Sequence, residues 1–161
     1  IEISDFEATA LNVLGDGLNR ELTAATSLLE RVFYWTNGHP YLTQRLCRSI
    51  ADDASIQDLN AVDKMCETLF LSARAQEEDD NLSFVRRWLL SSEAPTAELL
   101  ETYGRILTGE GEDAASISEL SLQTLHLSGV ISMHANRVTV RNQIYARAFH
   151  SEWVKRQLEK L

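Results

Sequence analysis

Gly38, His39 and Pro40 are the residues of this chain whose types and spacing are best suited to binding a ligand. Proline has a fixed φ angle near the helical value and no amide hydrogen, so it suits the first position of a helix. A glycine readily takes the left-handed conformation that ends a helix. The pattern predicts a corner between two helices, where free amides of residues 41–43 could receive an anion or a flat ring. Ordinary helix punctuation remains the structural alternative.

Apolar residues at helical spacing predict the elements that hold this corner. They lie on both sides of it: Leu28, Leu29, Val32, Phe33 and Trp35 before, and Leu42, Leu46, Cys47 and Ile50 after. A capping-box pattern of Ser4 and Glu7 predicts an earlier helix, and further helices are expected from about residue 60 and over 82–90. We expect these helices to form one bundle over residues 1–92.

The pattern changes after Pro95. A helix is expected over 96–108 and one or two short helices over 117–127, and then the apolar period falls to two in residues 130–133 and 138–140, which indicates a β-hairpin. A long helix is expected over 142–158. This order predicts a winged-helix domain over residues 93–161, so the expected fold class is mainly α with one small β-hairpin.

Charge is distributed unevenly along the 161 residues, whose formal net charge is −9. Residues 1–112 carry 9 Lys and Arg against 20 Asp and Glu, whereas residues 113–161 carry 6 against 4. An acidic surface disfavours binding to nucleic acids and to anionic membranes. No stretch is apolar enough to span a membrane or resembles a signal peptide, so a cytoplasmic protein is expected.

Motifs for catalysis and for metal binding are absent from the sequence. No glycine precedes a lysine as in the phosphate loop Gly-x-x-x-x-Gly-Lys-Ser/Thr, so the chain alone is not expected to be an enzyme or to bind Mg-nucleotide. The four histidines lack spacing suited to zinc. Cys47 and Cys66 lie on apolar helical faces, where reduced, buried thiols are expected.

Two blocks of sequence resemble a known family. The first comprises Gly38, His39, Pro40, Tyr41, Leu42 and Gln44, and the second comprises residues 127–131 and 138–145 with Phe149, Trp153 and Val154. Both are similar to the helical lid and winged helix of AAA-like ATPases of the STAND class, which act in signal transduction. The resemblance implies that residues 1–92 are a lid bundle, and that an ATPase core lies upstream of Ile1 in the same polypeptide.

The resemblance also implies a function and residue roles. The region would be non-catalytic, would close over ATP or ADP bound with Mg by the separate core, and would switch conformation in signalling. Pro40 would pack on adenine, Gly38 would form the turn, and His39 would lie at its exposed apex. The family's Met-His-Asp motif is not matched after the second strand, where Arg141 would approach phosphate instead. A surface Arg141 that caps the last helix together with Asn142 remains the alternative.

Two other functions remain open. The chain could be a free-standing adaptor that binds a protein partner, or that associates with itself. It could also be a winged-helix DNA-binding module, but the helix over 119–128, which would enter the groove, contains no Lys or Arg. Nucleic acid is therefore not an expected partner.

Overall fold

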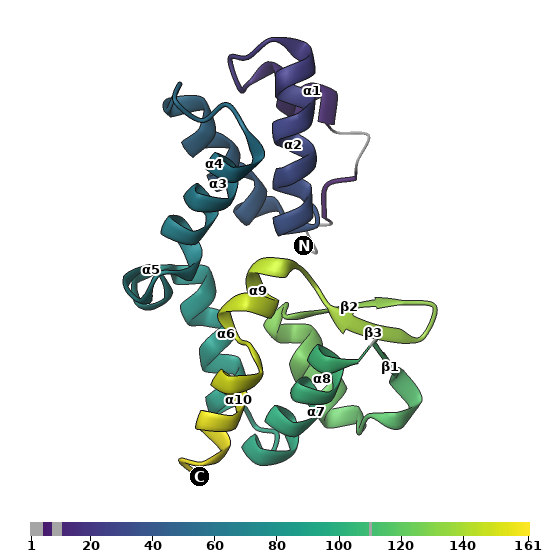
Figure 1. The fold of residues 1–161 in the computed structure, drawn as a ribbon. Helices are drawn as coiled ribbons and strands as arrows, with labels where there is room; N and C mark the ends of the chain where they lie inside the picture. The colour runs from purple at the N-terminus through teal and green to yellow at the C-terminus, as the bar shows by residue number, and fades with distance from the viewer. Residues whose placement is uncertain (1–4, 8–10, 110) are drawn as a thin grey trace. The chain divides into compact units, whose positions relative to one another are not determined.

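The computed structural model describes residues 5–7, 11–109 and 111–161. These residues are mostly α-helical and include a small three-stranded antiparallel sheet, which confirms the predicted fold class (Figure 1). The chain divides into two compact units, residues 1–75 and 76–161. Two predictions fall outside the described residues: the upstream boundary at Ile1 and the helix cap at Ser4.

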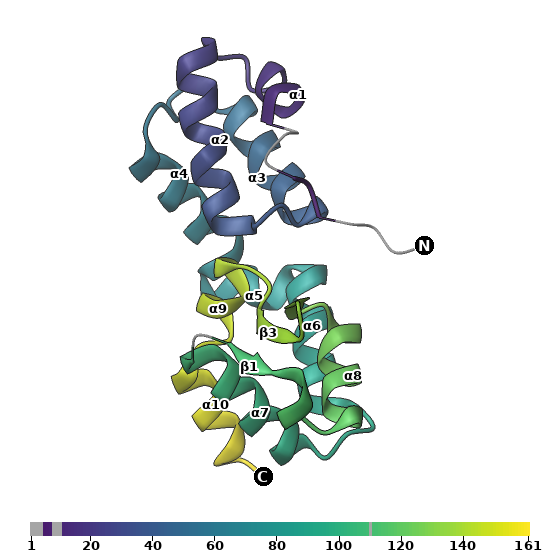
Figure 2. The same ribbon diagram turned by 90° about the vertical axis from the view of Figure 1, so that its right-hand side faces the viewer.

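The first unit is a bundle built around α2 (Leu22–Thr36). The other elements are α1 (Leu11–Asp16), α3 (Pro40–Asp52), α4 (Leu59–Cys66) and a π-helical turn, η2 (Glu67–Leu71). Figure 2 shows α1, α3 and α4 arranged about α2. The apolar residues of α2 and α3 that the sequence placed at helical spacing are buried, apart from the half-buried Phe33. Cys47 and Cys66 are free and buried as expected, and burial raises the pKa of Cys47 to about 11.

A carboxylate joins two helices of this bundle. Asp63 on α4 accepts hydrogen bonds from Arg31 Nε at 2.7 Å and Nη2 at 2.9 Å, and from the indole nitrogen of Trp35 at 2.7 Å. The hydrogen bonds from Arg31 to Asp63 raise the pKa of Arg31 above its usual value. Both donors lie on α2, four residues apart and therefore on one helical face.

The second unit has the topology of a winged helix. After α5 (Ala73–Glu78), which spans the boundary, its elements are α6 (Asp80–Ser91), α7 (Thr96–Thr108), β1 (Glu112–Asp113), a 3₁₀ turn η3 (Ala114–Ser116), α8 (Glu119–Ser128), β2 (Ile131–His134), β3 (Arg137–Val140), α9 (Gln143–Ala148) and α10 (Ser151–Leu158). The strand order is β1-β3-β2, with Glu112 paired with Val138 and Ile131 with Val140. Ala135 and Asn136 form the hairpin turn with positive φ angles of 49° and 65°.

Three expectations about element boundaries were wrong. Residues 5–7 are not helical, and the long C-terminal helix is divided into α9 and α10, because His150 caps the second helix by accepting a hydrogen bond from the Trp153 amide. Strand β1 was not among the expected elements. It is only two residues long, and its pairing with β3 is a non-local contact that periodicity cannot reveal.

The division of the chain also differs from the expected domains, residues 1–92 and 93–161. Helix α6 belongs to the second unit, where it packs on α7 and α8. The side chain of Asn81 accepts a 2.6 Å hydrogen bond from the hydroxyl of Tyr145, which lies on α9. The apolar face of α6, formed by Leu82, Val85 and Leu89, is buried against this unit. Periodicity predicted that face but could not identify its packing partner.

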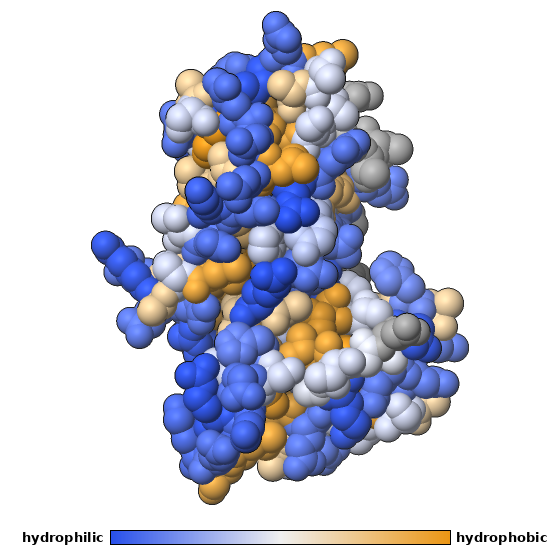
Figure 3. All heavy atoms as spheres, viewed as in Figure 1, coloured by the Kyte–Doolittle hydropathy of each residue, from blue (hydrophilic) through white to orange (hydrophobic). Residues whose placement is uncertain are grey.

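The face of the molecule drawn in Figure 3 is predominantly polar. Figure 3 shows hydrophilic residues over most of one face, with hydrophobic residues in separate small areas. Within the part of the chain that the structure describes, no helix combines the length and apolar character needed to cross a membrane. The same residues contain no group of three or more His, Cys, Asp or Glu side chains placed to hold a metal ion.

Candidate functional site

The predicted corner is present between α2 and α3. Helix α2 ends at Thr36, and Asn37 and Gly38 both have left-handed backbones, with φ angles of 46° and 80°. His39 is the N-cap of α3 and Pro40 is its first residue. A buried hydrogen bond of 2.8 Å between the hydroxyls of Thr36 and Thr43 ties the two helices together. The two helices therefore meet at the position that the Gly-x-Pro pattern predicted.

The amides of the corner are less available than the sequence suggested. The Leu42 amide donates to Nδ1 of His39 at 3.4 Å, and the Thr43 amide donates to the carbonyl of His39 at 2.8 Å. The prediction that His39 lies at an exposed apex was wrong, since only 7% of the surface of His39 is exposed. The His39 ring itself caps α3, because its Nδ1 accepts the hydrogen bond from the Leu42 amide, and the side chain is therefore directed inward.

The N-terminal segment covers Gly38. The Phe6 amide donates a 2.7 Å hydrogen bond to the carbonyl of Gly38. A Cβ atom on residue 38 would lie 2.1 Å from the carbonyl oxygen of Phe6. Glycine is therefore required both by the positive φ angle and by the close approach of this second backbone.

Pro40 and Tyr41 form the accessible side of the corner. Pro40 is half-buried, and Tyr41 is 41% exposed. The hydroxyl of Tyr41 accepts a 3.1 Å hydrogen bond from Arg45, one turn further along α3, and the Arg45 guanidinium lies over the Phe70 ring at 5.3 Å. A flat ligand would contact Pro40 and Tyr41 rather than His39. The spacing of Tyr41 and Arg45, four residues apart after a helix-starting proline, was the signal that sequence reasoning did not use.

Arg141 lies in the second unit, between β3 and α9. Its backbone amide donates to the carbonyl of Val130 at 2.9 Å, and its Nη1 is 3.5 Å from the carbonyl of Gly129. Asn142, and not Arg141, caps α9, because the Asn142 side chain accepts a 2.9 Å hydrogen bond from the Tyr145 amide. The structure thus brings Gly38, His39 and Pro40 together in one unit and places Arg141 in the other.

Helix α8, the helix that would enter the groove in a DNA-binding module, has a partly apolar outer face. Leu120 is 44% exposed and Leu127 is 54% exposed. Glu98 on α7 accepts hydrogen bonds from the hydroxyls of Ser118 and Ser121, which lower the pKa of Glu98 and fix the start of the helix. Exposed leucines on this face are unlike the cationic surface that DNA phosphates require.

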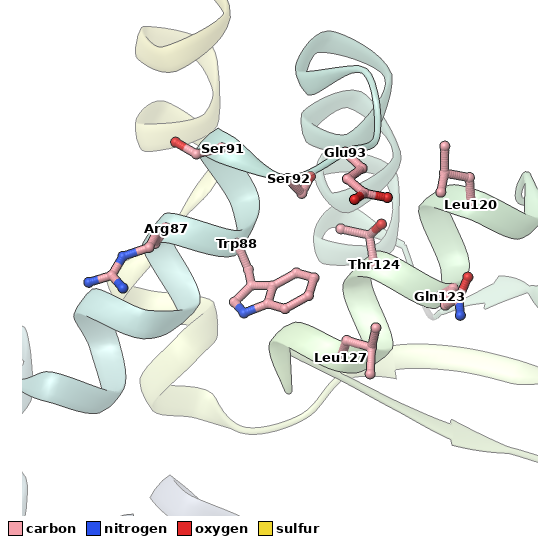
Figure 4. A pocket seen from close by; sticks show the side chains of 9 residues that line it. All are labelled: Arg87, Trp88, Ser91, Ser92, Glu93, Leu120, Gln123, Thr124 and Leu127. Atoms are coloured by element: carbon pink, nitrogen blue, oxygen red, sulfur yellow. The ribbon is translucent and has the colours of Figure 1, made fainter.

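A hollow of about 380 Å³ is lined by residues of α6, of the loop after it and of α8 (Figure 4). Its lining residues are Arg87, Trp88, Ser91, Ser92, Glu93, Leu120, Gln123, Thr124 and Leu127. Sequence reasoning did not identify this hollow, because it depends on the packing of two helices from separate parts of the chain. Trp88, an aromatic residue next to the apolar Leu89 of the predicted helix, was the available signal in the sequence.

The whole chain is similar to a segment of a longer protein. This relative is an uncharacterized WD repeat-containing protein of Synechocystis sp., 27% identical over 176 aligned residues. The alignment covers 100% of this chain but 14% of the relative, so the chain spans about one seventh of that protein's length. No family model matches the chain, and no solved structure matches it.

Proposed function

We propose that this chain is a non-catalytic regulatory region of a larger, AAA-like ATPase of the STAND class. The corner from Asn37 to Pro40 carries this proposal, because its left-handed turn and helix-starting proline resemble the Gly-x-Pro element of the family's lid. The bundle around α2 would be the lid, and the second unit would be the winged helix that follows it. The strand order β1-β3-β2 supports the second assignment.

The similarity to the cyanobacterial protein supports a place within a longer polypeptide. A WD repeat is an all-β unit of about 40–45 residues with four strands. The described residues of this chain are mostly helical. The segment shared with that relative is therefore distinct from a WD-repeat array, and it occupies 14% of a protein that contains such repeats. A helical region combined with other domains is the setting in which a regulatory role is expected.

The proposed mechanism is closure over a nucleotide bound elsewhere. ATP or ADP with Mg would be held by a separate core, with Pro40 and Tyr41 packing on adenine and Arg141 approaching phosphate. The Phe6–Gly38 hydrogen bond supports this arrangement, since a domain joined N-terminally to residues 5–7 would enter the bundle at the corner. Exchange of the nucleotide would shift the region between two conformations, as differential binding requires.

Nucleotide retention tests this proposal in the full-length protein that contains the chain. Pro40→Ala combined with Arg141→Ala is expected to lower the amount of ADP that copurifies by about tenfold or more, because it removes a stacking surface and a charge. Pro95→Ala combined with Arg147→Ala is the matched control and is expected to retain ADP. Unchanged retention in the first double variant, with an unchanged melting temperature, would exclude the proposal.

A protein-binding module that contacts no nucleotide is the second candidate. The exposed leucines of α8 and the hollow beside them favour it, since apolar side chains on a recognition helix suit a protein surface better than DNA. This second function would be supported if the full-length protein contains no nucleotide after purification, both in its unaltered form and in the two double variants.

A further inference from the structure

The hollow between α6 and α8 has an apolar floor with one aromatic face. Figure 4 shows the Trp88 indole extending from α6 toward α8, where it faces Leu127 and Thr124. The Phe84 ring lies beside Trp88, with centroids 6.2 Å apart, and is itself 44% exposed. The floor can therefore accept aliphatic carbon or a flat group stacked on the indole.

Polar atoms gather along one edge of the hollow. Figure 4 shows the Glu93 carboxylate extending from the loop after α6 to a position above Thr124. Among the described residues, Glu93 has neither a hydrogen bond nor an ion pair. The hydroxyl oxygen of Ser92 is buried and has no hydrogen-bond partner among the residues that the structure describes. Arg87, the cation among the lining residues, directs its guanidinium away from Glu93 (Figure 4).

This combination selects for a cation with an aliphatic stem. An anion would be repelled by Glu93, and a purely apolar group would desolvate that carboxylate without pairing with it. A guanidinium donates five hydrogen bonds in one plane, stacks on tryptophan and pairs with a carboxylate through two parallel bonds. A lysine ammonium could pair with Glu93, but it lacks the flat surface that matches the indole.

We propose that the hollow binds an arginine side chain presented by a protein partner. The arginine stem would lie on Trp88 and Leu127, with its guanidinium between the indole and the Glu93 carboxylate. The exposed side chains of Leu120 and Leu127 indicate a polypeptide rather than a small cation, because apolar residues flanking the arginine would cover them. The net charge of −9 favours the approach of such a basic segment. This inference is independent of the proposed nucleotide function.

Binding of a blocked peptide tests the proposal on the whole chain. The probe is acetyl-Leu-Arg-Leu-amide, and its neutral counterpart replaces arginine with citrulline, which keeps the shape but not the charge. The indole N–H resonance of Trp88, assigned with Trp88→Phe, is expected to shift with the arginine peptide and to saturate below about 10 mM. The citrulline peptide is expected to produce no saturable shift.

Two variants identify the contribution of the carboxylate. Glu93→Gln is expected to weaken binding of the arginine peptide by about fivefold or more, since it removes the ion pair. Glu101→Gln, which neutralises an exposed carboxylate on α7, is the matched control and should bind as the unaltered chain does. The proposal is overturned if the Trp88 resonance does not shift, if citrulline binds equally well, or if Glu93→Gln weakens binding by less than fivefold.

Discussion

At the scale of single residues, Gly38 is constrained both by its backbone conformation and by a neighbouring backbone. Its φ angle of 80° disfavours any side chain, and the carbonyl of Phe6 occupies the space where a Cβ would be. The sequence predicted the left-handed conformation, because glycine two residues before a helix-starting proline is a local signal. The sequence could not predict the close approach of the Phe6 backbone to Gly38, because this approach is a tertiary contact.

Gly38→Ala is expected to destabilise the first unit by more than about 2 kcal/mol. The left-handed conformation alone costs about 1–2 kcal/mol for a residue with a Cβ, and displacement of Phe6 adds to this cost. The free energy of unfolding in urea measures the effect. Gly15→Ala in α1 is the control, because its Cβ would meet the flexible Leu29 side chain at 3.4 Å. Equal stability of the two variants would contradict the required close approach at Gly38.

At the scale of elements, the bundle depends on the contact between α2 and α4 through Asp63. This carboxylate accepts hydrogen bonds from Arg31 and Trp35. Helical periodicity predicted both helices but not the contact, because charged residues on amphipathic helices usually face solvent. The wing was more predictable, since a hairpin is formed by neighbouring residues with a period of two.

Asp63→Ala is expected to destabilise the first unit by about 1–3 kcal/mol, because it leaves the indole N–H of Trp35 without its acceptor and the Arg31 guanidinium without its ion pair. Chemical denaturation followed by circular dichroism measures the change. Asp52→Ala is the control: its ion pair with Arg48 on α3 is 4.0 Å long and exposed, so a loss below about 0.5 kcal/mol is expected. A loss at Asp63 no larger than at Asp52 would show that the contact contributes little.

At the scale of the whole molecule, the packing of α6 sets the boundary between the two compact units. Its apolar residues are buried against α7 and α8, so the second unit includes residues that the sequence assigned to the bundle. Pro95 and the serines before it resemble a linker in composition, but they connect two helices of one compact unit. Composition marks the ends of elements more reliably than the boundaries of domains.

Expression of fragments tests this division. Residues 72–161, which keep α5 and α6, are expected to fold alone and to give dispersed amide resonances with a cooperative thermal transition. Residues 93–161 are expected to remain unfolded or to aggregate, because removal of α6 exposes the apolar faces of α7 and α8. A cooperatively folded 93–161 fragment would instead support the boundary that the sequence suggested.

The sequence by itself determined most of the helices, the corner at Gly38 to Pro40 and the hairpin, because caps, turns and apolar periods are set by residues close together in the chain. The tertiary structure alone decided that Phe6 covers Gly38, that α6 joins the second unit, and that Trp88 and Glu93 line one hollow with α8. These features depend on which apolar faces meet. Many pairings of such faces satisfy the same pattern, and only close packing of complementary side chains selects one of them.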